Sequence, residues 1–114
     1  MTVRDVRLYL EDILESITLI IQYCGDLTKD EFEEEIEKQD SIIRRLEIIG
    51  EAARQIPDNL KMENPDIPWR DIGDFRNVLV HEYFGLKIDR VWRVIHKDLP
   101  KLKEQIEKLI QELG

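Results

Sequence analysis

The chain has 114 residues, enough for one domain with a modest core and no appended module. Hydrophobic residues make up 42% of it and charged residues 37%, which is typical of long amphipathic helices and argues against a disordered chain. The net charge of −8 argues against general nucleic-acid binding, because lysine and arginine provide most of that affinity.

The amino-terminal part predicts a helix and no membrane anchor. Apolar residues recur at three- and four-residue spacing over residues 3–25, and the pattern stops at Gly25. No window of about 18 uncharged apolar residues occurs and no charged leader precedes an apolar run, so we expect a cytoplasmic protein with no membrane partner. Cys24 is the only cysteine, which rules out an intrachain disulfide and favours a packing role.

Two further helices are predicted before Pro57. Thr28 and Glu31 have the spacing of a capping box, so an acidic helical turn is expected to begin there. Apolar residues then follow the helical period as far as Pro57, which ends the pattern. Gly50 lies inside this second helix, where it costs about 1 kcal/mol of helix propensity relative to alanine. We therefore predict that another element packs closely against Gly50.

A loop and another helix are expected next. Three prolines and two asparagines in residues 57–68 indicate the longest loop of the chain. Pro68 suits the first turn of the following helix, which is expected to run to about Phe84 and to break at Gly85.

The last helix is expected to begin near Asp89 and to contain Pro100. Proline lacks a backbone donor, so Pro100 must kink this helix or divide it into two helices joined end to end. No segment alternates with the period of a strand. The sequence therefore predicts an all-α protein, an antiparallel bundle of four to five helices that forms a single domain over residues 1–114.

The one basic stretch of the chain covers residues 69–103. It contains 8 Lys and Arg against 5 Asp and Glu, a net charge of +3, whereas residues 1–68 have a net charge of −9. A phosphate ligand would therefore meet a local positive field there. The alternative is a solvated helix face that consists of Lys87, Arg90, Arg93 and Lys97.

Four side chains in this stretch suit RNA cleavage by the neighbouring 2′-hydroxyl: Arg76, Asn77, His81 and Tyr83. That reaction needs a base for the hydroxyl proton, an acid for the leaving oxygen and a cation for the charge on phosphorus. Histidine titrates near neutral pH, and arginine presents a charged, planar fork of donors to phosphate. Arginine and histidine at this spacing also occur often by chance, and a purely structural dimer with a buried histidine is one alternative. His96 follows two arginines in a similar way, and we interpret it as a surface or boundary residue.

Helix geometry separates Arg76 from His81. At about 100° per residue, His81 lies roughly 140° around the helix axis from Arg76, whereas Asn77 and His81 share a face. Either the long Arg76 side chain reaches round, or a second copy of the chain completes the site across a two-fold axis. We favour the second arrangement, which predicts a homodimer. Tyr83 is seven residues after Arg76, so it would lie near the same azimuth, as a core tyrosine with its hydroxyl at the rim.

Several blocks resemble one known family. Residues 76–83 resemble the R-x4-H-x-Y signature of HepT-like toxins, a branch of the HEPN superfamily. Residues 49–53 resemble the family's IGEA block and residues 67–72 its IPW-x-x-I lead-in, and the last helix, with Ile88-Asp89 and Asp98-Leu99-Pro100, also fits. The resemblance spans almost the whole chain.

This resemblance implies a HEPN-like fold and a metal-independent endoribonuclease toxin that acts as a homodimer on RNA. It implies that Arg76 and His81 are catalytic, that Asn77 assists them, and that no metal or cofactor is needed. The family's usual partner is an MntA-like nucleotidyltransferase antitoxin that adenylylates the motif tyrosine, here Tyr83. An alternative is a non-catalytic subunit that binds nucleotide or substrate for such a nucleotidyltransferase.

Overall fold

A computed structural model describes residues 5–114, which form an all-helical bundle. The helices are α1 (Val6–Cys24), α2 (Lys29–Glu34), α3 (Ile36–Arg54), α4 (Asp58–Glu63), α5 (Trp69–His81), α6 (Ile88–Arg93) and α7 (Leu99–Leu113), with a 3₁₀ turn at Tyr83–Gly85 and a π-helical turn at Val94–Asp98. The all-α class predicted from the sequence is confirmed. The four long rods follow the apolar periodicity, α2 is the acidic helical turn predicted at Thr28, and the short helix α4 was not predicted.

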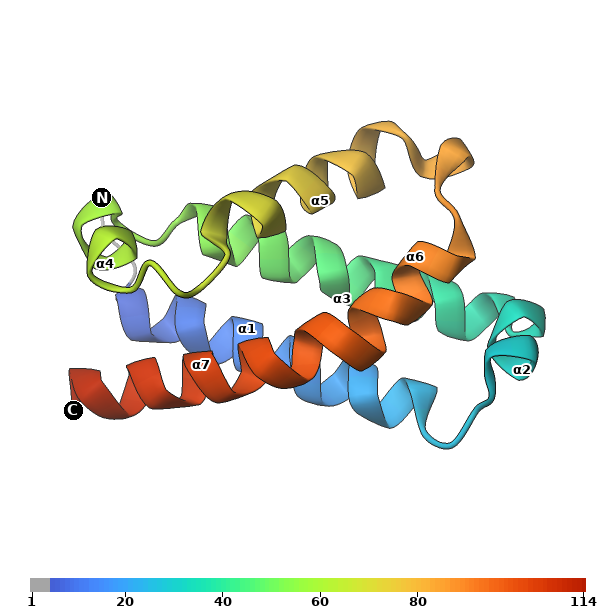
Figure 1. The fold of residues 1–114 in the computed structure, drawn as a ribbon, viewed down its shortest axis with the longest axis horizontal. Helices are drawn as coiled ribbons and strands as arrows, with labels where there is room; N and C mark the ends of the chain where they lie inside the picture. Colours follow the sequence, from blue (N-terminus) through green and yellow to red (C-terminus); the bar gives the residue numbers. More distant parts are fainter. Residues whose placement is uncertain (1–4) are drawn as a thin grey trace.

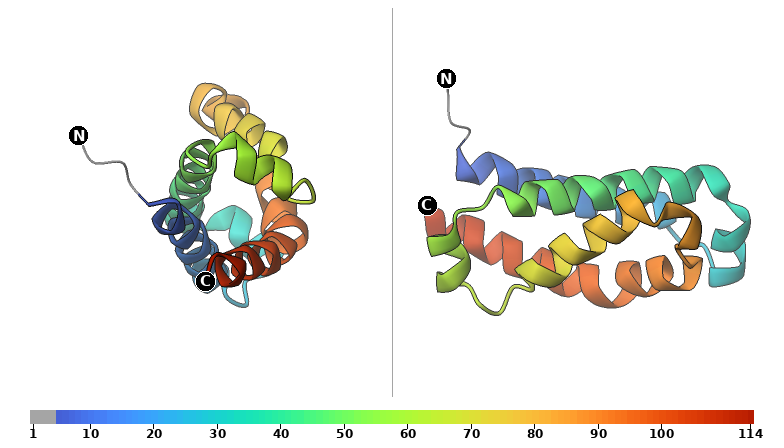
Figure 2. Two further views of the ribbon diagram at one scale, coloured as in Figure 1. Left: turned by 90° about the vertical axis from the view of Figure 1, so that its left-hand side faces the viewer. Right: turned by 90° about the horizontal axis from the view of Figure 1, so that it is seen from above.

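The four long rods are α1, α3, α5 and the continuous α6–α7 rod, and successive rods run in alternating directions (Figure 1). The helix α3 packs against both α1 and α5, and α7 packs against α1. Viewed from the end, the rods surround a common interior, with α5 and α7 at the two ends of the series (Figure 2). Because α5 packs mainly on α3, its other side faces the α6–α7 rod across a hollow.

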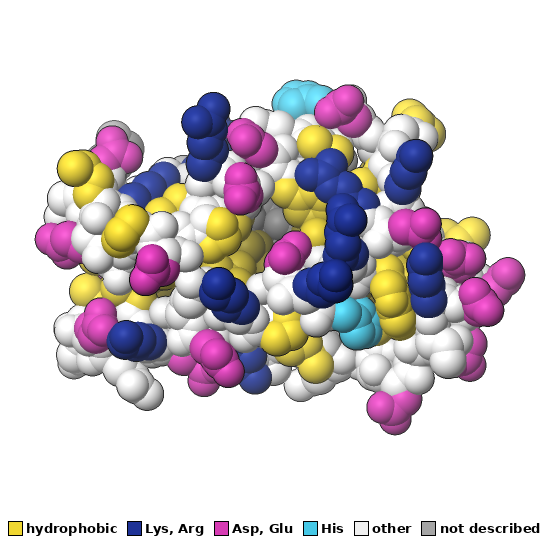
Figure 3. All heavy atoms as spheres, viewed as in Figure 1, with side chains coloured by type: hydrophobic (Ala, Val, Ile, Leu, Met, Phe, Trp, Pro, Cys, Tyr) yellow, Lys and Arg dark blue, Asp and Glu magenta, His cyan; other side chains and the backbone are white. Residues whose placement is uncertain are grey.

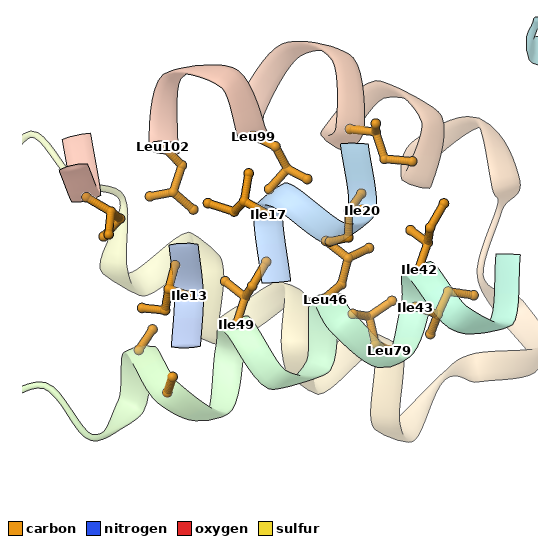
Figure 4. Packing of buried hydrophobic residues seen from close by; sticks show 14 of the residues in the cluster. Ile13, Ile17, Ile20, Ile42, Ile43, Leu46, Ile49, Leu79, Leu99 and Leu102 are labelled. Carbon is orange, nitrogen blue, oxygen red and sulfur yellow. The ribbon is translucent and has the colours of Figure 1, made fainter. Parts of the chain in front are cut away.

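The core is built mainly from isoleucine and leucine side chains of these four rods. Figure 4 shows α1, α3, α5 and α7 contributing side chains to the common interior; the labelled ones are Ile13, Ile17, Ile20, Ile42, Ile43, Leu46, Ile49, Leu79, Leu99 and Leu102. All ten are buried. Leu79 is the only α5 residue in the buried class, so this side chain anchors the helix that carries the candidate site. Cys24 is also buried, as its predicted packing role requires, and burial raises the pKa of its thiol.

The end of α1 and the start of α2 agree with the sequence prediction. The structure describes α1 from its N-cap Asp5 onward, and the predicted start at residue 3 lies outside the described residues. The helix ends at Gly25, whose φ of +51° is one that glycine adopts readily. The predicted capping box is present, since the Thr28 backbone N–H donates to Glu31 at 2.9 Å and the Glu31 N–H donates to the Thr28 hydroxyl at 3.2 Å.

The predicted loop over residues 57–68 was partly wrong, because it contains α4. Pro57 occupies the N-cap of α4, where its missing N–H breaks no helical hydrogen bond. The segment is then closed by polar contacts. The Asn64 side chain donates to the Leu60 carbonyl at 3.0 Å, and the Trp69 indole donates to the Asn64 carbonyl at 3.1 Å.

The predicted interruption at Pro100 takes the form of two helices joined end to end. The π-helical turn at Val94–Asp98 links α6 to α7, and the Leu99 N–H reaches back to the Val94 carbonyl. Pro100 can donate no hydrogen bond to the turn before it, so the wider π turn absorbs the mismatch. The rod bends where α6 passes into α7 (Figure 1).

None of the helices in the described part of the chain combines the length and the apolar character needed to cross a membrane.

Candidate functional site

The helix α5 carries Arg76, Asn77 and His81, and it ends at His81. The sequence predicted that this helix would continue to Phe84, and that prediction was wrong. Glu82 leaves the helical conformation (φ −125°, ψ 33°), and a 3₁₀ turn at Tyr83–Gly85 follows. His81 is therefore the last helical residue, and Tyr83 belongs to a separate turn.

Arg76 is seated against the backbone of α3. A Cβ atom added to Gly50 would overlap the Arg76 Cβ and would lie 2.6 Å from its Cγ, much closer than nonbonded carbon atoms approach. The first carbons of Arg76 thus occupy the place that a side chain at Gly50 would need. This confirms the close packing predicted at Gly50 and explains why a glycine lies inside α3.

The guanidinium of Arg76 lies among polar groups of α3 and α5. Its Nη1 donates to the Asn77 Oδ1 at 3.3 Å, and its Nη2 lies 3.9 Å from the Glu51 Oε1. Glu51 is in turn 3.8 Å from Arg44, so one carboxylate serves two cations. The Arg76 Nε is buried and has no hydrogen-bond partner among the described residues. An unpaired buried donor costs about 1–3 kcal/mol, so this position of the guanidinium is kept against a real penalty.

The side chains of Asn77 and His81 are exposed on one face of α5, four residues apart. His81 is exposed in the single chain, so a structural role as a buried histidine would need a second copy of the chain to cover it. Arg76 contacts Asn77, but no hydrogen bond between described residues joins Arg76 to His81. Asn77 thus lies between the two groups, contacting one and sharing a face with the other. His96 is exposed on another rod and stacks on Trp92 at a centroid distance of 4.0 Å, as a surface residue. Figure 3 shows the two histidines well apart.

Tyr83 does not lie in the apolar stripe of α5, and this part of the sequence prediction was wrong. Because α5 ends at His81, helical spacing no longer places Tyr83 on the same side of the helix as Arg76. Its ring is 45% exposed, and its hydroxyl donates to the Asp40 Oδ1 of α3 at 2.9 Å. This hydrogen bond, with some desolvation and the charges of Asp40 and Glu47, raises the pKa of Tyr83 above its usual value.

Two hollows flank the rods that carry the basic stretch. The larger, here called the main cleft, has a volume of about 400 Å³ and lies between α5 and the α6–α7 rod. Its lining includes the apolar Leu46, Ile49, Ile72, Phe75, Leu99 and Leu102, the basic Arg90, Arg93, Lys97 and Lys101, and the acidic Asp66, Asp71 and Asp98. Figure 3 shows lysine and arginine side chains gathered beside this hollow.

The smaller hollow, here called the end hollow, has a volume of about 370 Å³ and lies where α5 turns toward α6. Val78 and Leu86 line it, and Arg90 and Arg93 line both hollows. Arg90 also lies over the Phe75 ring, with 4.8 Å between its Cζ and the ring centroid. None of the four predicted site residues lines either hollow, although Phe75 and Val78 are their chain neighbours.

Within residues 5–114, no group of three or more His, Cys, Asp and Glu side chains is arranged to hold a metal ion.

Two contacts of the site were missed in the sequence. Glu51 belongs to the block of residues 49–53, but its position beside Arg76 depends on the pairing of α3 with α5. Asp40 lies 43 residues before Tyr83, and no local pattern links the two. Such contacts between elements carry no signal in the spacing of a single sequence.

The chain belongs to the ribonuclease HepT-like family, whose model matches residues 13–109. The enzyme class predicted from the sequence, a ribonuclease, is confirmed by this membership.

Named relatives support the same family. A protein of Thermococcus cleftensis named "Probable ribonuclease HepT" is 42% identical over 93% of this chain and 96% of its own length. A candidate RNase of Methanocaldococcus jannaschii is 38% identical over 94% of this chain and 98% of its own length. Another protein of M. jannaschii, whose name combines gamma-glutamylcyclotransferase with a candidate RNase, is 44% identical over 96% of this chain. The chain spans only half the length of that relative. No solved structure shows a significant match to the chain.

Proposed function

We propose that this protein is a metal-independent endoribonuclease and the toxin of a prokaryotic toxin–antitoxin system. The observation that carries the proposal is the seating of Arg76, whose guanidinium is held at the α3–α5 contact with a buried, unpaired Nε. Asn77 accepts a hydrogen bond from this guanidinium and lies on the same face of α5 as the exposed His81. A fixed cation and a titratable imidazole on one short segment fit phosphodiester cleavage.

Each residue has a role in this reaction. His81 takes or returns a proton as the 2′-hydroxyl attacks the phosphorus and the 5′-oxygen leaves. Arg76 donates to the phosphate oxygens as charge accumulates on them. Asn77 holds the guanidinium through its 3.3 Å hydrogen bond and offers an amide to the same phosphate.

The site is completed by a second copy of the chain. Val80 and Phe84 are exposed apolar residues near His81, and Phe84 is fully exposed. On α3, Ile36 is 68% exposed and lies one helical turn before Asp40, which binds the Tyr83 hydroxyl. Exposed apolar groups gathered in one place mark an interaction surface, and a partner related by two-fold symmetry would cover them while placing its own Arg76 near this His81.

The RNA approaches along the basic side of the molecule. The net charge of −8 disfavours broad nucleic-acid affinity, but Arg90 and Arg93 line both hollows and Lys97 and Lys101 continue the basic lining of the main cleft. A local positive field of this kind attracts a phosphate backbone to one face of an acidic protein.

Cleavage of RNA is expected to continue in the presence of excess chelator and to leave 2′,3′-cyclic phosphate and 5′-hydroxyl ends. These ends follow because the neighbouring 2′-hydroxyl is the nucleophile. The measurement is gel and mass analysis of the products from a short synthetic RNA. The matched control substrate carries a single 2′-deoxy nucleotide at the cleaved position and should stay intact there. Cleavage that stops on chelation, or that persists at the deoxy position, would contradict the mechanism.

We further propose that an MntA-like nucleotidyltransferase antitoxin neutralises the enzyme by transferring adenylate to Tyr83. The exposure of the Tyr83 ring and its place two residues after His81 support this site. An adenylate there would add bulk and negative charge beside the catalytic pair, and would repel and exclude the incoming RNA phosphate.

The variant Tyr83→Phe is expected to gain no adenylate mass when it is coexpressed with an MntA-like nucleotidyltransferase, because it lacks the accepting oxygen. Intact-protein mass spectrometry measures the gain, and the matched control is Tyr23→Phe, which removes a half-buried tyrosine hydroxyl from the end of α1. Added mass on the Tyr83 variant, or none on the wild type, would refute Tyr83 as the acceptor.

The second candidate is a non-catalytic subunit that binds nucleotide for a nucleotidyltransferase. The main cleft favours it, since apolar and basic side chains line one hollow of about 400 Å³, and such a lining suits a base and its phosphates. Under this alternative the unmodified protein would bind nucleotide and leave RNA intact.

A further inference from the structure

The hydrogen bond from Tyr83 to Asp40 joins the turn after α5 to α3. Its length is 2.9 Å, and it is made by the same phenolic oxygen that the proposed modification would use. We propose that Asp40 is the proton acceptor for adenylylation of Tyr83, so that the toxin chain itself supplies the base for its own modification. This inference rests on the proposed acceptor role of Tyr83.

The surroundings of the bond fit an attacking hydroxyl. Asp40 is an exposed residue near the start of α3, and Tyr83 is 45% exposed, so a second protein can reach the pair. The Tyr83 ring packs edge-on against Phe84 with a centroid distance of 5.7 Å, which restricts its orientation. The hydroxyl donates to a carboxylate oxygen at 2.9 Å, and a general base must lie within this reach of the group whose proton it removes.

A base is needed because the phenol does not ionise by itself near neutral pH. The hydrogen bond to Asp40 and the charges of Asp40 and Glu47 raise the pKa of Tyr83, so the phenolate is scarcer than for a free tyrosine. Attack must therefore begin from the neutral phenol and lose its proton as the new bond forms. An aspartate is ionised at neutral pH and performs the same task for hydroxyl substrates of protein kinases.

The Tyr83 oxygen attacks the α-phosphorus of ATP, a new oxygen–phosphorus bond forms, and the bond to the leaving pyrophosphate breaks. The phenolic proton passes to an oxygen of Asp40. The protonated carboxyl then returns this proton to water.

A purely structural role for Asp40 makes a different prediction. If Asp40 only anchors the turn, Asp40→Asn should be modified almost as fast as the wild type, because the asparagine oxygen can still accept the hydrogen bond. Asp40→Ala should then be slow, since it loses the anchor. If Asp40 is the base, both variants are slow, and Asp40→Glu restores part of the rate. Glu37→Gln is the matched control, because it removes one exposed carboxylate from the same helix.

The test measures the rate of adenylate gain on purified full-length protein with an MntA-like nucleotidyltransferase, ATP and Mg²⁺ between pH 6 and pH 9. We expect Asp40→Asn to be slower by about a hundredfold at pH 7. The ratio of wild-type to Asp40→Asn rates should fall as the pH rises, because hydroxide increasingly supplies the missing base. Glu37→Gln should match the wild type, and melting temperatures should show that all variants are folded.

Equal rates for Asp40→Asn and wild type, or a ratio that does not change with pH, would overturn the role of Asp40 while leaving Tyr83 as the acceptor. No adenylate on the wild-type protein would remove the acceptor role of Tyr83 itself, and with it the proton transfer.

Discussion

Replacing His81 with alanine is expected to slow RNA cleavage by at least about a hundredfold, the usual contribution of one general acid or base. Arg76→Ala should cost at least as much, because it removes both the phosphate ligand and the side chain that fills the space at Gly50. Arg76→Lys should fall between Arg76→Ala and the wild type, since it keeps the charge and loses the planar fork of donors. The measurement is the initial rate of cleavage of one synthetic RNA by each purified protein.

His96→Ala is the matched control for His81→Ala. His96 is also exposed, but it stacks on Trp92 in the α6–α7 rod and lies away from the candidate site. We expect this variant to keep nearly the full rate of cleavage. Equal rates for the His81 and His96 variants would remove the catalytic assignment of His81.

The second large effect is expected at Gly50. In Gly50→Ala the new methyl group overlaps the Arg76 Cβ, and neither group can move without shifting a helix backbone. Such overpacking costs about 1–3 kcal/mol, which outweighs the roughly 1 kcal/mol gained by replacing a helical glycine. Because Arg76 is displaced from its seat, cleavage should also slow by about tenfold to a hundredfold.

Gly73→Ala is the matched control for Gly50→Ala. Gly73 lies in α5, and apart from its chain neighbours and the backbone of its own helix no described atom is within 4 Å of the place that its Cβ would take. This variant should gain about 1 kcal/mol in free energy of unfolding and should keep its activity. Urea denaturation and cleavage rates of the two variants give both comparisons. A Gly50→Ala protein that is as stable and as active as Gly73→Ala would show that the tight contact with Arg76 is unimportant.

Local sequence signals predicted the helix ends that depend on local chemistry. The capping box at Thr28 and Glu31, the end of α1 at Gly25 and the interruption before Pro100 all follow from hydrogen bonds within a few residues. The tight packing at Gly50 was also predictable, because an unfavourable residue inside a helix implies a compensating contact. The partner in that contact, Arg76, was not, since it depends on how α3 and α5 pair.

The end of α5 shows what a single sequence does not contain. Glu82 favours helices, yet the helix ends there, and the turn that follows is held to α3 by the bond from Tyr83 to Asp40. Periodicity therefore placed Tyr83 on the wrong side, because the azimuth of a residue has meaning only while the helix continues. Arg76 and His81 were found as a pattern, but neither the sequence nor one copy of the fold joins them in one site.

Whether two chains share each active site can be measured with two purified heterodimers that carry the same pair of substitutions. One joins an Arg76→Ala subunit to a His81→Ala subunit, and the other joins a wild-type subunit to the double variant. If Arg76 of one subunit acts with His81 of the other, the first heterodimer retains one intact site and about half the wild-type rate of RNA cleavage, and the second is inactive. An inactive first heterodimer beside a half-active second one would contradict a shared site, and would place the complete reaction within a single chain.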